Sequence, residues 1–138
     1  MAKFEKVSRF KDVDLPMPVR KTAHSAGYDF VVAEDITIEP WTEMFNLMNM
    51  NTNTAGAPLT IEDVALVTKT FKAKPSLVST GMKCKLDEGT YLELSVRSSS
   101  PLKYWLLLAN GVGIIDKDYY NNPDNEGEIF FQIYNLSP

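Results

Sequence analysis

The sequence has 138 residues, of which 44% are hydrophobic and 23% are charged, and its formal net charge is −4. This length is typical of one domain with its own hydrophobic core. The composition excludes a wholly disordered chain, a collagen and a disulfide scaffold. The negative charge argues against nucleic-acid binding through a broad basic surface. No apolar run approaches the roughly 18 residues of a membrane span, so we expect neither nucleic acid nor membrane as a partner.

The first ten residues, MAKFEKVSRF, lack the apolar segment of a secretory signal, and we therefore expect a cytosolic protein. The sequence contains one cysteine, Cys84, and one histidine, His24. An internal disulfide is excluded, and a zinc site built from these two residue types lacks ligands. Cys84 lies in a strand-like alternating run and is predicted to be a small core residue. His24 is predicted to lie in an exposed loop.

Short β-strands are predicted along most of the chain. Alternating stretches begin at residues 3–7, and residues 28–39 alternate well in their second half, which predicts a strand. Residues 77–86 and 90–97 also alternate, and the Asp-Glu-Gly turn at 87–89 between them predicts a hairpin.

The last third of the chain continues this pattern. Residues 104–109, YWLLLA, are a solid apolar run that is too short to predict a helix. Residues 127–136 predict a strand, and the Asn, Pro and Asp content of residues 119–127 predicts a loop. Many short strands separated by turn residues indicate an all-β sandwich or barrel.

Residues 41–75 depart from the β pattern and are predicted to be a helical insertion in the β fold. WTEMFNLMNM has helix-compatible apolar spacing, and NTNTAGAP resembles a linker. Thr60 and Asp63 then form a capping-box-like pair ahead of a run in which Ile61, Val64 and Ala65 share a face with Phe71. The methionines of this segment fit either a core or a surface for a protein partner.

Four clusters carry residues suited to chemistry. Asp29 follows the small residues Ser25-Ala26-Gly27 and then Tyr28, where it is either a local cap or a site residue. The run RSSSP at 97–101 offers a guanidinium and hydroxyls, which suit a polyphosphate but also form turns. The segment NGVGIIDKDYY at 110–120 combines a glycine-permitted sharp hairpin with Asp116, a possible general base or a solvated turn residue. Gly127-Glu128-Ile129 at the last strand is uninformative alone.

Taken together and in order, these segments resemble the successive motifs of the homotrimeric dUTP diphosphatases (dUTPases). The matching segments are SAGYDF, VRSSSPLK, NGVGIIDKDYY and GEIFFQIYN, within about residues 15–38 and 77–136. The resemblance implies one distorted jelly-roll β-barrel or sandwich domain over residues 1–138 with a short helical insertion at about 41–75. It also implies a homotrimer with shared active sites, and hydrolysis of dUTP to dUMP and pyrophosphate by water attack on the α-phosphate.

The resemblance assigns roles residue by residue. Asp116 matches the carboxylate that orients the attacking water, and Tyr119 matches the aromatic residue that packs under the deoxyribose. Phosphates would be held across a subunit boundary, and uracil would be read by the third motif with its backbone. The residues implied for phosphate binding are Arg97, Ser98 and Ser99, and those for the base and sugar are Asn110, Gly113, Ile114 and Ile115. Asp29 matches a residue that helps to place Mg²⁺ through water, while the triphosphate supplies most ligands.

The sequence departs from the family pattern in two places. Compact members have a short turn where residues 41–73 stand here, and members with such insertions occur among phages and Gram-positive bacteria. A typical member also continues into a Gly-x-Arg-x-Ala-Gln-like strand and a Gly-rich tail, and these motifs are missing before Pro138. We expect the natural polypeptide to continue.

Two other functions share part of this pattern. A dCTP deaminase has the same fold and the Arg-Ser-Ser motif, but its third motif lacks the Asn-Gly-Val-Gly segment. A regulatory protein-binding module would use the 41–75 insertion against a protein partner, with or without catalysis.

Overall fold

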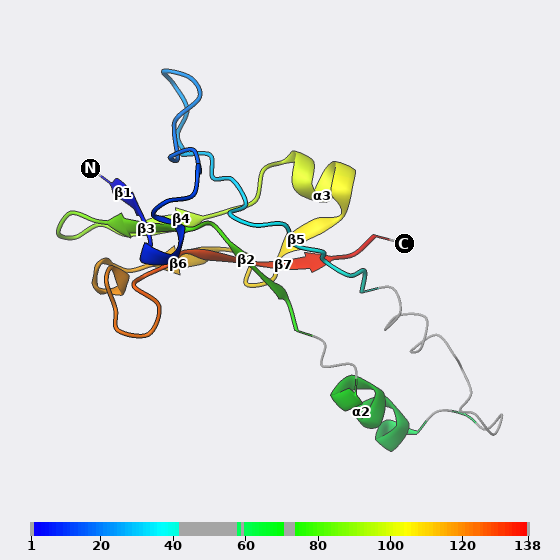
Figure 1. Cartoon of the computed structure of the whole chain (residues 1–138). Helices are drawn as coiled ribbons and strands as arrows, with labels where there is room; N and C mark the ends of the chain where they lie inside the picture. The colour runs from blue at the N-terminus through cyan, green and yellow to red at the C-terminus, as the bar shows by residue number, and fades with distance from the viewer. Residues whose placement is uncertain (1, 42–57, 59, 71–73, 138) are drawn as a thin grey trace.

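The computed structural model describes residues 2–41, 58, 60–70 and 74–137 (Figure 1). Short β-strands predominate in this part of the chain. The strands are β1 (Lys3–Lys6), β2 (Ser76–Ser79), β3 (Met82–Lys85), β4 (Leu92–Leu94), β5 (Leu106–Leu108), β6 (Gly113–Ile115) and β7 (Phe130–Asn135). The helices are α2 (Ile61–Thr70) and α3 (Ser99–Tyr104), with 3-10 turns η1 (Ser8–Phe10) and η2 (Lys117–Tyr119). The predicted all-β class with a helical insertion is confirmed. Neither of the helices in the described part of the chain has the length and apolar character of a membrane span.

The strands pair in three small antiparallel sheets. β1 pairs with β3, β4 pairs with β6, and β7 lies between β2 and β5. Over the described ranges these sheets do not close into a continuous barrel. Neighbours along the chain therefore often belong to different sheets, which brings the N-terminal strand against the middle of the chain.

Residues 28–39 do not form the predicted strand. They contribute isolated bridges at Asp29, with Val19, and at the following Pro40, with Asn135. The chain bends at Ala33 and Glu34, and the Ala33 amide donates to the Ser79 carbonyl at 2.9 Å. Because of this bend, the segment makes isolated bridges with its neighbours. Its alternating hydrophobic pattern is therefore not accompanied by a continuous ladder of strand hydrogen bonds.

The two predicted hairpins are also wrong in their pairing. The turn at 87–89 forms, with the Thr90 amide donating to the Asp87 carbonyl at 3.3 Å, but β3 and β4 on either side pair with β1 and β6. The turn at Asn110–Gly111 likewise connects β5 to β6, which lie in different sheets. The apolar run at 104–109 contains β5, and α3 has no counterpart among the predicted elements. These turns carry the chain between sheets because each strand finds its apolar partners elsewhere.

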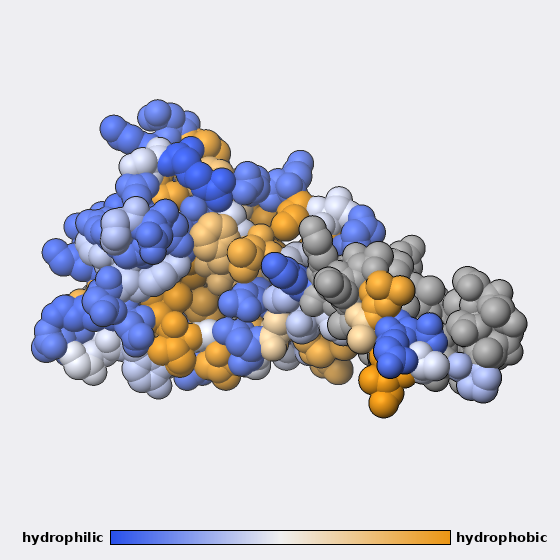
Figure 2. All heavy atoms as spheres, turned by 90° about the horizontal axis from the view of Figure 1, so that it is seen from below, coloured by the Kyte–Doolittle hydropathy of each residue, from blue (hydrophilic) through white to orange (hydrophobic). Residues whose placement is uncertain are grey.

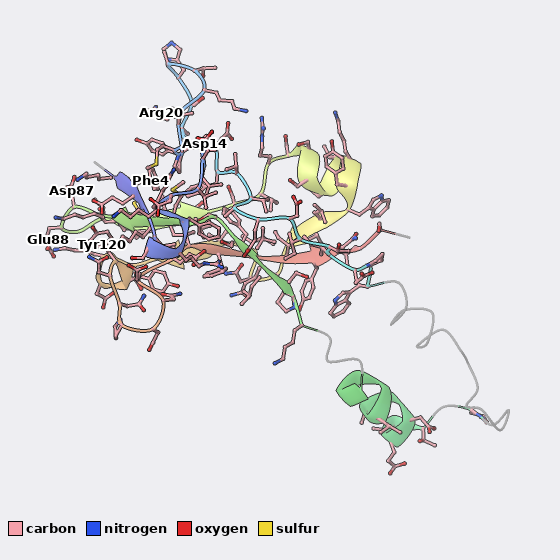
Figure 3. The ribbon with its side chains drawn as sticks, viewed as in Figure 1. Phe4, Asp14, Arg20, Asp87, Glu88 and Tyr120 are labelled. Atoms are coloured by element: carbon pink, nitrogen blue, oxygen red, sulfur yellow. The ribbon has the colours of Figure 1, made fainter. Side chains whose placement is uncertain are left out.

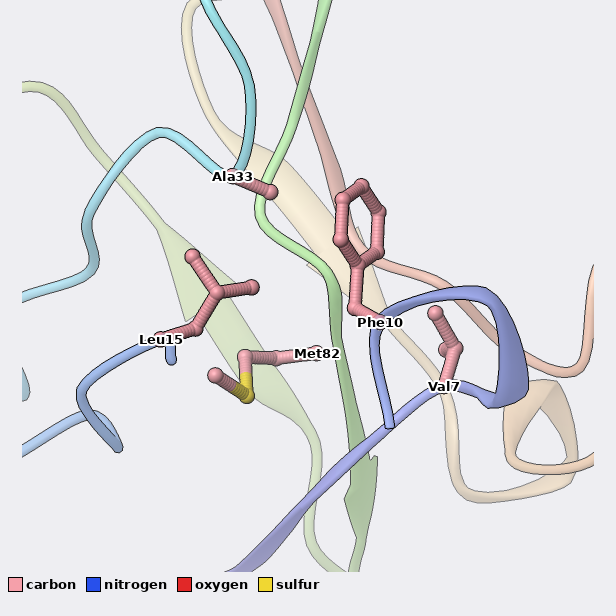
Figure 4. Packing of buried hydrophobic residues seen from close by; sticks show 5 residues of the cluster. All are labelled: Val7, Phe10, Leu15, Ala33 and Met82. Carbon is pink, nitrogen blue, oxygen red and sulfur yellow. The ribbon is translucent and has the colours of Figure 1, made fainter. Parts of the chain in front are cut away.

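The core consists of three adjoining clusters of buried side chains. One cluster joins Val7 and Phe10 to Leu15, Ala33 and Met82 (Figure 4). The second surrounds Ile129, which is fully buried, and includes Cys84 at 1% exposure. Burial raises the pKa of the Cys84 thiol to about 11, so the prediction of Cys84 as a core residue is confirmed. His24 is exposed in the loop between Arg20 and Asp29, as expected.

The insertion contains the predicted helix, and its predicted cap is confirmed. The Thr60 amide donates to the Asp63 carboxylate at 2.7 Å and the Asp63 amide donates to Thr60 Oγ1 at 3.1 Å. The bond from the Thr60 amide, and a second one that the Thr60 hydroxyl donates to the same carboxylate at 2.8 Å, lower the pKa of Asp63. The predicted apolar face is not buried where it is described, because Ile61 is 89% exposed. Figure 2 shows hydrophobic atoms at the surface in the part of the molecule that carries α2. The Met-rich segment and Phe71 lie outside the described residues.

Gly127 generates the first testable prediction, with Gly89 as its matched control. Both have a left-handed φ, +79° and +70°, but a Cβ at Gly127 would lie 2.4 Å from the Tyr119 carbonyl oxygen, whereas one at Gly89 meets nothing within 4 Å. Gly89→Ala should lower the free energy of unfolding by about 1–2 kcal/mol, the cost of an L-residue with a left-handed backbone. Gly127→Ala should lower it by a further ~1–3 kcal/mol. Urea denaturation measures both, and equal losses would contradict the clash.

Candidate active site

Arg97, Ser98 and Ser99 lie where β4 leads into α3. The Arg97 side chain is 69% exposed, Ser98 is exposed, and Ser99 is half-buried at the first residue of the helix. The Arg97 carbonyl accepts from the Ser100 amide at 2.9 Å, which fixes the turn into α3. Among the described residues, neither the Ser98 nor the Ser99 hydroxyl has a hydrogen-bond partner, so a guanidinium and two hydroxyls are available together.

Asp29 lies beside Arg97. Its carboxylate, 34% exposed, is 3.9 Å from Arg97 Nε and 3.6 Å from Lys21 Nζ. The alternative that Asp29 is a local cap receives no support from its described contacts, which are with cations rather than with nearby backbone amides. Asp29, Arg97 and Ser100 line one pocket of about 270 Å³ whose other walls are mostly apolar. The structure therefore brings the first and second predicted motifs together.

The third motif begins in a tight turn after β5. The Gly111 amide donates to the Leu108 carbonyl at 3.0 Å and the Val112 amide to the Asn110 carbonyl at 2.8 Å. Gly111 has φ +70°, which explains a glycine here. Asn110 is exposed. Gly113 is buried, and a Cβ there would lie 3.1 Å from the Leu94 side chain, so its observed close contact is with β4.

The strand β6 carries the next residues of this motif. Ile114 is 52% exposed and pairs with Glu93, while Ile115 is half-buried and packs on the cluster around Cys84. Within the described ranges β6 has β4 as its one strand neighbour. The other edge of β6 therefore presents backbone donors and acceptors that no described strand uses.

Asp116 follows β6 directly. Its backbone is extended, at φ −81° and ψ 162°, and its carbonyl accepts from the Tyr119 amide at 3.2 Å at the start of η2. Its exposed carboxylate makes no hydrogen bond or ion pair with any described residue. A carboxylate held at a strand end without an intrachain partner can accept a proton from a bound water.

The two tyrosines after Asp116 have different partners. The Tyr119 hydroxyl donates to the Glu128 carbonyl at 3.0 Å and accepts from Asn125 Nδ2 at 2.8 Å. The Tyr120 hydroxyl donates to Glu5 Oε2 at 2.7 Å, on β1. This bond raises the pKa of Tyr120 and lowers that of Glu5. Tyr120 lies at the end of the molecule that also carries Asp87 and Glu88 (Figure 3).

The predicted residues are spread along the paired strands β4 and β6: Gly113 lies opposite Leu94, three residues before Arg97, whereas Asp116 and Tyr119 follow the other end of β6. α3, which follows Arg97, lies at one end of the β region in Figure 1, and the orange turn after β6 lies at the other. The sequence reasoning missed Asn125 and the buried carboxylate of Glu128. A charged residue between glycine and the apolar run IFF was the available signal, because a buried charge needs partners.

Comparisons with known proteins agree on one family. A deoxyuridine 5′-triphosphate nucleotidohydrolase of Lactococcus lactis is 36% identical over 134 residues, covering 97% of this chain and 68% of that protein. One of Corynebacterium diphtheriae is 32% identical over 127 residues, covering 92% of this chain and 59% of that protein. No protein-family model matches the chain.

Solved structures give the same result. The dUTPase of Streptococcus mutans superimposes with a TM-score of 0.69 at 39% identity, over 97% of this chain and 79% of that one. A mutant dUTPase from phage phi11 of Staphylococcus aureus, in which a structural Mg(II) ion is coordinated, has a TM-score of 0.59 at 19% identity. The match covers 100% of this chain and 61% of the phage protein, and it supports the fold. The architecture is therefore the dUTPase jelly roll, and the chain belongs to the deoxyuridine 5′-triphosphate nucleotidohydrolase (dUTPase) family.

Proposed function

We propose that this chain hydrolyses dUTP to dUMP and pyrophosphate, with Asp116 as the general base. The observation that carries the proposal is the position of Asp116 within the segment NGVGIIDKDYY of a dUTPase-family chain. Asp116 directly follows β6, and its exposed carboxylate has no partner among the described residues. The matching relatives are named for this reaction. The nucleoside triphosphate pool lies in the cytosol, which is the location we propose for the enzyme.

Uracil binds along the third motif. The edge of β6 that no described strand pairs with offers backbone groups of alternate residues among Gly113, Ile114 and Ile115, and main-chain donors and acceptors can complement the edge of a base. Asn110 adds an exposed amide at the preceding turn. Gly113 is paired with Leu94 in the sheet, and a Cβ at Gly113 would lie 3.1 Å from the Leu94 side chain, so glycine allows the strand that presents these groups to lie close to β4.

The triphosphate binds at Arg97, Ser98 and Ser99. A guanidinium and hydroxyls with no strong intrachain partner suit the charge and the donor requirement of phosphates. Mg²⁺ accompanies the triphosphate. No group of three or more His, Cys, Asp or Glu in the described part of the chain could hold the ion alone, whereas one carboxylate, Asp29, together with phosphate oxygens and water is a set that Mg²⁺ accepts. When bound, the ion neutralises charge on the phosphates.

The chemical step is a displacement at the α-phosphorus. Asp116 accepts a proton from water as the water oxygen bonds to the α-phosphorus and the bond to the bridging oxygen breaks. The products are dUMP and pyrophosphate. Tyr119 packs under the deoxyribose, where an added 2′-hydroxyl would meet the ring and lose its hydrogen bonds. Tyr119 takes this role because of its place in the third motif, three residues after Asp116.

The active enzyme is a homotrimer with shared sites. The support is the spacing of Arg97 from Asp116 and Tyr119 along one chain. Arg97 follows β4, Asp116 and Tyr119 follow the opposite end of the paired strand β6, and Figure 1 shows α3 and the turn after β6 at different ends of the β region. A neighbouring subunit would bring Arg97 to a nucleotide whose base lies on another subunit's β6.

A protein partner at the insertion is a second proposed role. It is supported by α2, where Ile61 is 89% and Leu66 is 65% exposed. Exposed apolar side chains gathered on one element are typical of an interaction surface.

Asp116→Asn should lower kcat for dUTP about 10²–10⁴-fold, the usual contribution of a general base. Binding of dUTP should persist, because the amide has the same shape. Steady-state kinetics and calorimetric titration measure the two effects. Turnover close to that of the wild type would refute the role of Asp116.

Mixed trimers test the sharing of sites. Arg97→Ala and Asp116→Asn chains should each have little activity alone. When they are refolded together in equal amounts, random assortment should restore activity to about a quarter of the wild-type level, because some sites combine an intact Arg97 with an intact Asp116. Absence of any recovery in verified mixed trimers would show that each site is built within one subunit.

The sugar preference should depend on Tyr119. We expect kcat/KM for dUTP to exceed that for UTP by about two orders of magnitude or more, since an unpaired hydroxyl costs roughly 1–3 kcal/mol and steric overlap adds to it. Tyr119→Ala should lower the affinity for dUTP and narrow the preference. Tyr120→Ala is the control and should leave the preference intact; the reverse pattern would move the role to Tyr120.

A further inference from the structure

The loop after Tyr119 is organised by two asparagine side chains. Asn122 Oδ1 accepts from the amides of Asp124 and Asn125 at 3.0 and 3.1 Å. Asn125 Oδ1 accepts from Asn122 Nδ2 at 2.8 Å and from the Gly127 amide at 3.0 Å. Each asparagine thus satisfies the backbone of a tight turn, and the loop has a defined shape.

The same Asn125 side chain also reaches the hydroxyl of Tyr119. Its Oδ1 is used entirely within the loop, while its Nδ2 donates to the Tyr119 hydroxyl at 2.8 Å. That hydroxyl in turn donates to the Glu128 carbonyl at 3.0 Å. Asn125 is therefore the side chain that connects the shape of the loop to the orientation of the ring.

The loop is itself fixed to the rest of the fold at two acidic residues. The Glu128 carboxylate accepts from Arg9 Nε at 3.1 Å, from Arg9 Nη2 at 2.9 Å and from Ser79 Oγ at 2.5 Å. The Glu126 carboxylate accepts from the Ser8 amide at 2.8 Å and from Ser8 Oγ at 2.7 Å. Both partners of the Tyr119 hydroxyl therefore belong to a segment with little freedom to move.

We propose that Asn125 is a positioning residue for sugar selection, which fixes the Tyr119 ring through a hydrogen bond to its hydroxyl. The proposal rests on the proposed dUTP hydrolysis and adds a residue outside the motifs that carry the family resemblance. Without the Nδ2 donor the hydroxyl keeps only its bond to the Glu128 carbonyl, and the ring can rotate about that contact. A ring with this freedom can yield to a 2′-hydroxyl, so discrimination against UTP weakens while the chemistry at Asp116 is untouched.

The test compares kcat and KM for dUTP and UTP in Asn125→Asp, Tyr119→Phe and the double variant. The new carboxylate keeps the acceptor oxygen that the Gly127 amide and Asn122 need, but it has no hydrogen to donate to Tyr119. Its other oxygen and the Glu128 carbonyl then compete for the single hydrogen of the Tyr119 hydroxyl, so one of the two bonds to that hydroxyl is lost. We expect the ratio of kcat/KM for dUTP to that for UTP to fall about fivefold or more in each single variant, as for one lost hydrogen bond. The effect should lie mainly in KM. The double variant should lose no more than Tyr119→Phe alone, because that variant already removes the hydroxyl that Asn125 contacts.

Asn121→Asp is the matched control. It adds the same charge to the same loop, its left-handed φ of +58° is tolerated by aspartate, and its side chain accepts from Lys83 Nζ at 2.6 Å rather than touching Tyr119. The nucleotide ratio should be unchanged in this variant. An equal fall in Asn121→Asp would overturn the proposal by showing an effect of charge alone.

The remaining outcomes are equally decisive. A folded Asn125→Asp protein with an unaltered nucleotide ratio would overturn the proposal, and so would losses that add in the double variant. If Asn125→Asp fails to fold, Tyr119→Phe decides alone. An unaltered dUTP-to-UTP ratio of kcat/KM in that variant would show that the Tyr119 hydroxyl has no part in sugar selection, and would overturn the proposal. A wild-type protein that does not hydrolyse dUTP would instead overturn the proposed function, so the two failures are distinguishable.

Discussion

The buried carboxylate of Glu128 is the constraint on which much of the structure depends. Its side chain is 5% exposed, and a carboxylate in that position must be paired and hydrogen-bonded. Two nitrogens of Arg9 contact its two oxygens, and Ser79 Oγ donates to one of them. The Glu128 bond is also the first cause of the raised pKa of Arg9. These contacts join η1, β2 and the entry to β7.

This ion pair also fixes the course of the chain after Glu128. Ile129, the next residue, is completely buried, and its amide donates to the Met82 carbonyl at 2.8 Å. Thr80 closes the other side, because its amide and its hydroxyl both donate to the Ile129 carbonyl. β7 therefore starts from a fixed point and runs between β2 and β5, while the loop before Glu128 is fixed at its far end.

The sequence predicted the kinds of element better than their neighbours. Alternation located β1, β2, β3, β4 and β7, and the Thr60 and Asp63 pair marked the start of α2, since these signals are local. The pairing was missed at 87–89 and at 110–111, because a tight turn does not determine whether the strands beside it meet. Residues 28–39 show the converse, where an alternating run bends at Ala33 and makes isolated bridges.

The residues of the proposed site come from a different kind of signal. Asp116, Arg97 and Asn110 stand in segments that resemble the dUTPase motifs in content and in order, and this resemblance rather than local periodicity singles them out. The role of Asn125 could not be seen, because asparagine in a loop predicts only a turn. Its second contact, with Tyr119, depends on the three-dimensional course of the loop. The adjacent Tyr120 is a second example. Its hydroxyl bonds to Glu5 on β1, a contact that distinguishes it from Tyr119 but that the local sequence does not indicate.

The two halves of the proposed site differ in how firmly they are held, and the difference suits what each half binds. Strand pairing holds β6, and hydrogen bonds at both ends of the loop hold Tyr119. The phosphate half is an exposed turn whose guanidinium has one carboxylate 3.9 Å away. A neutral base is distinguished by the placement of short-range donors and acceptors, which requires a preformed edge. Phosphates attract a cation over longer distances, so Arg97 can be ordered when the nucleotide arrives. Preorganisation is thus concentrated where uracil and deoxyribose must be discriminated.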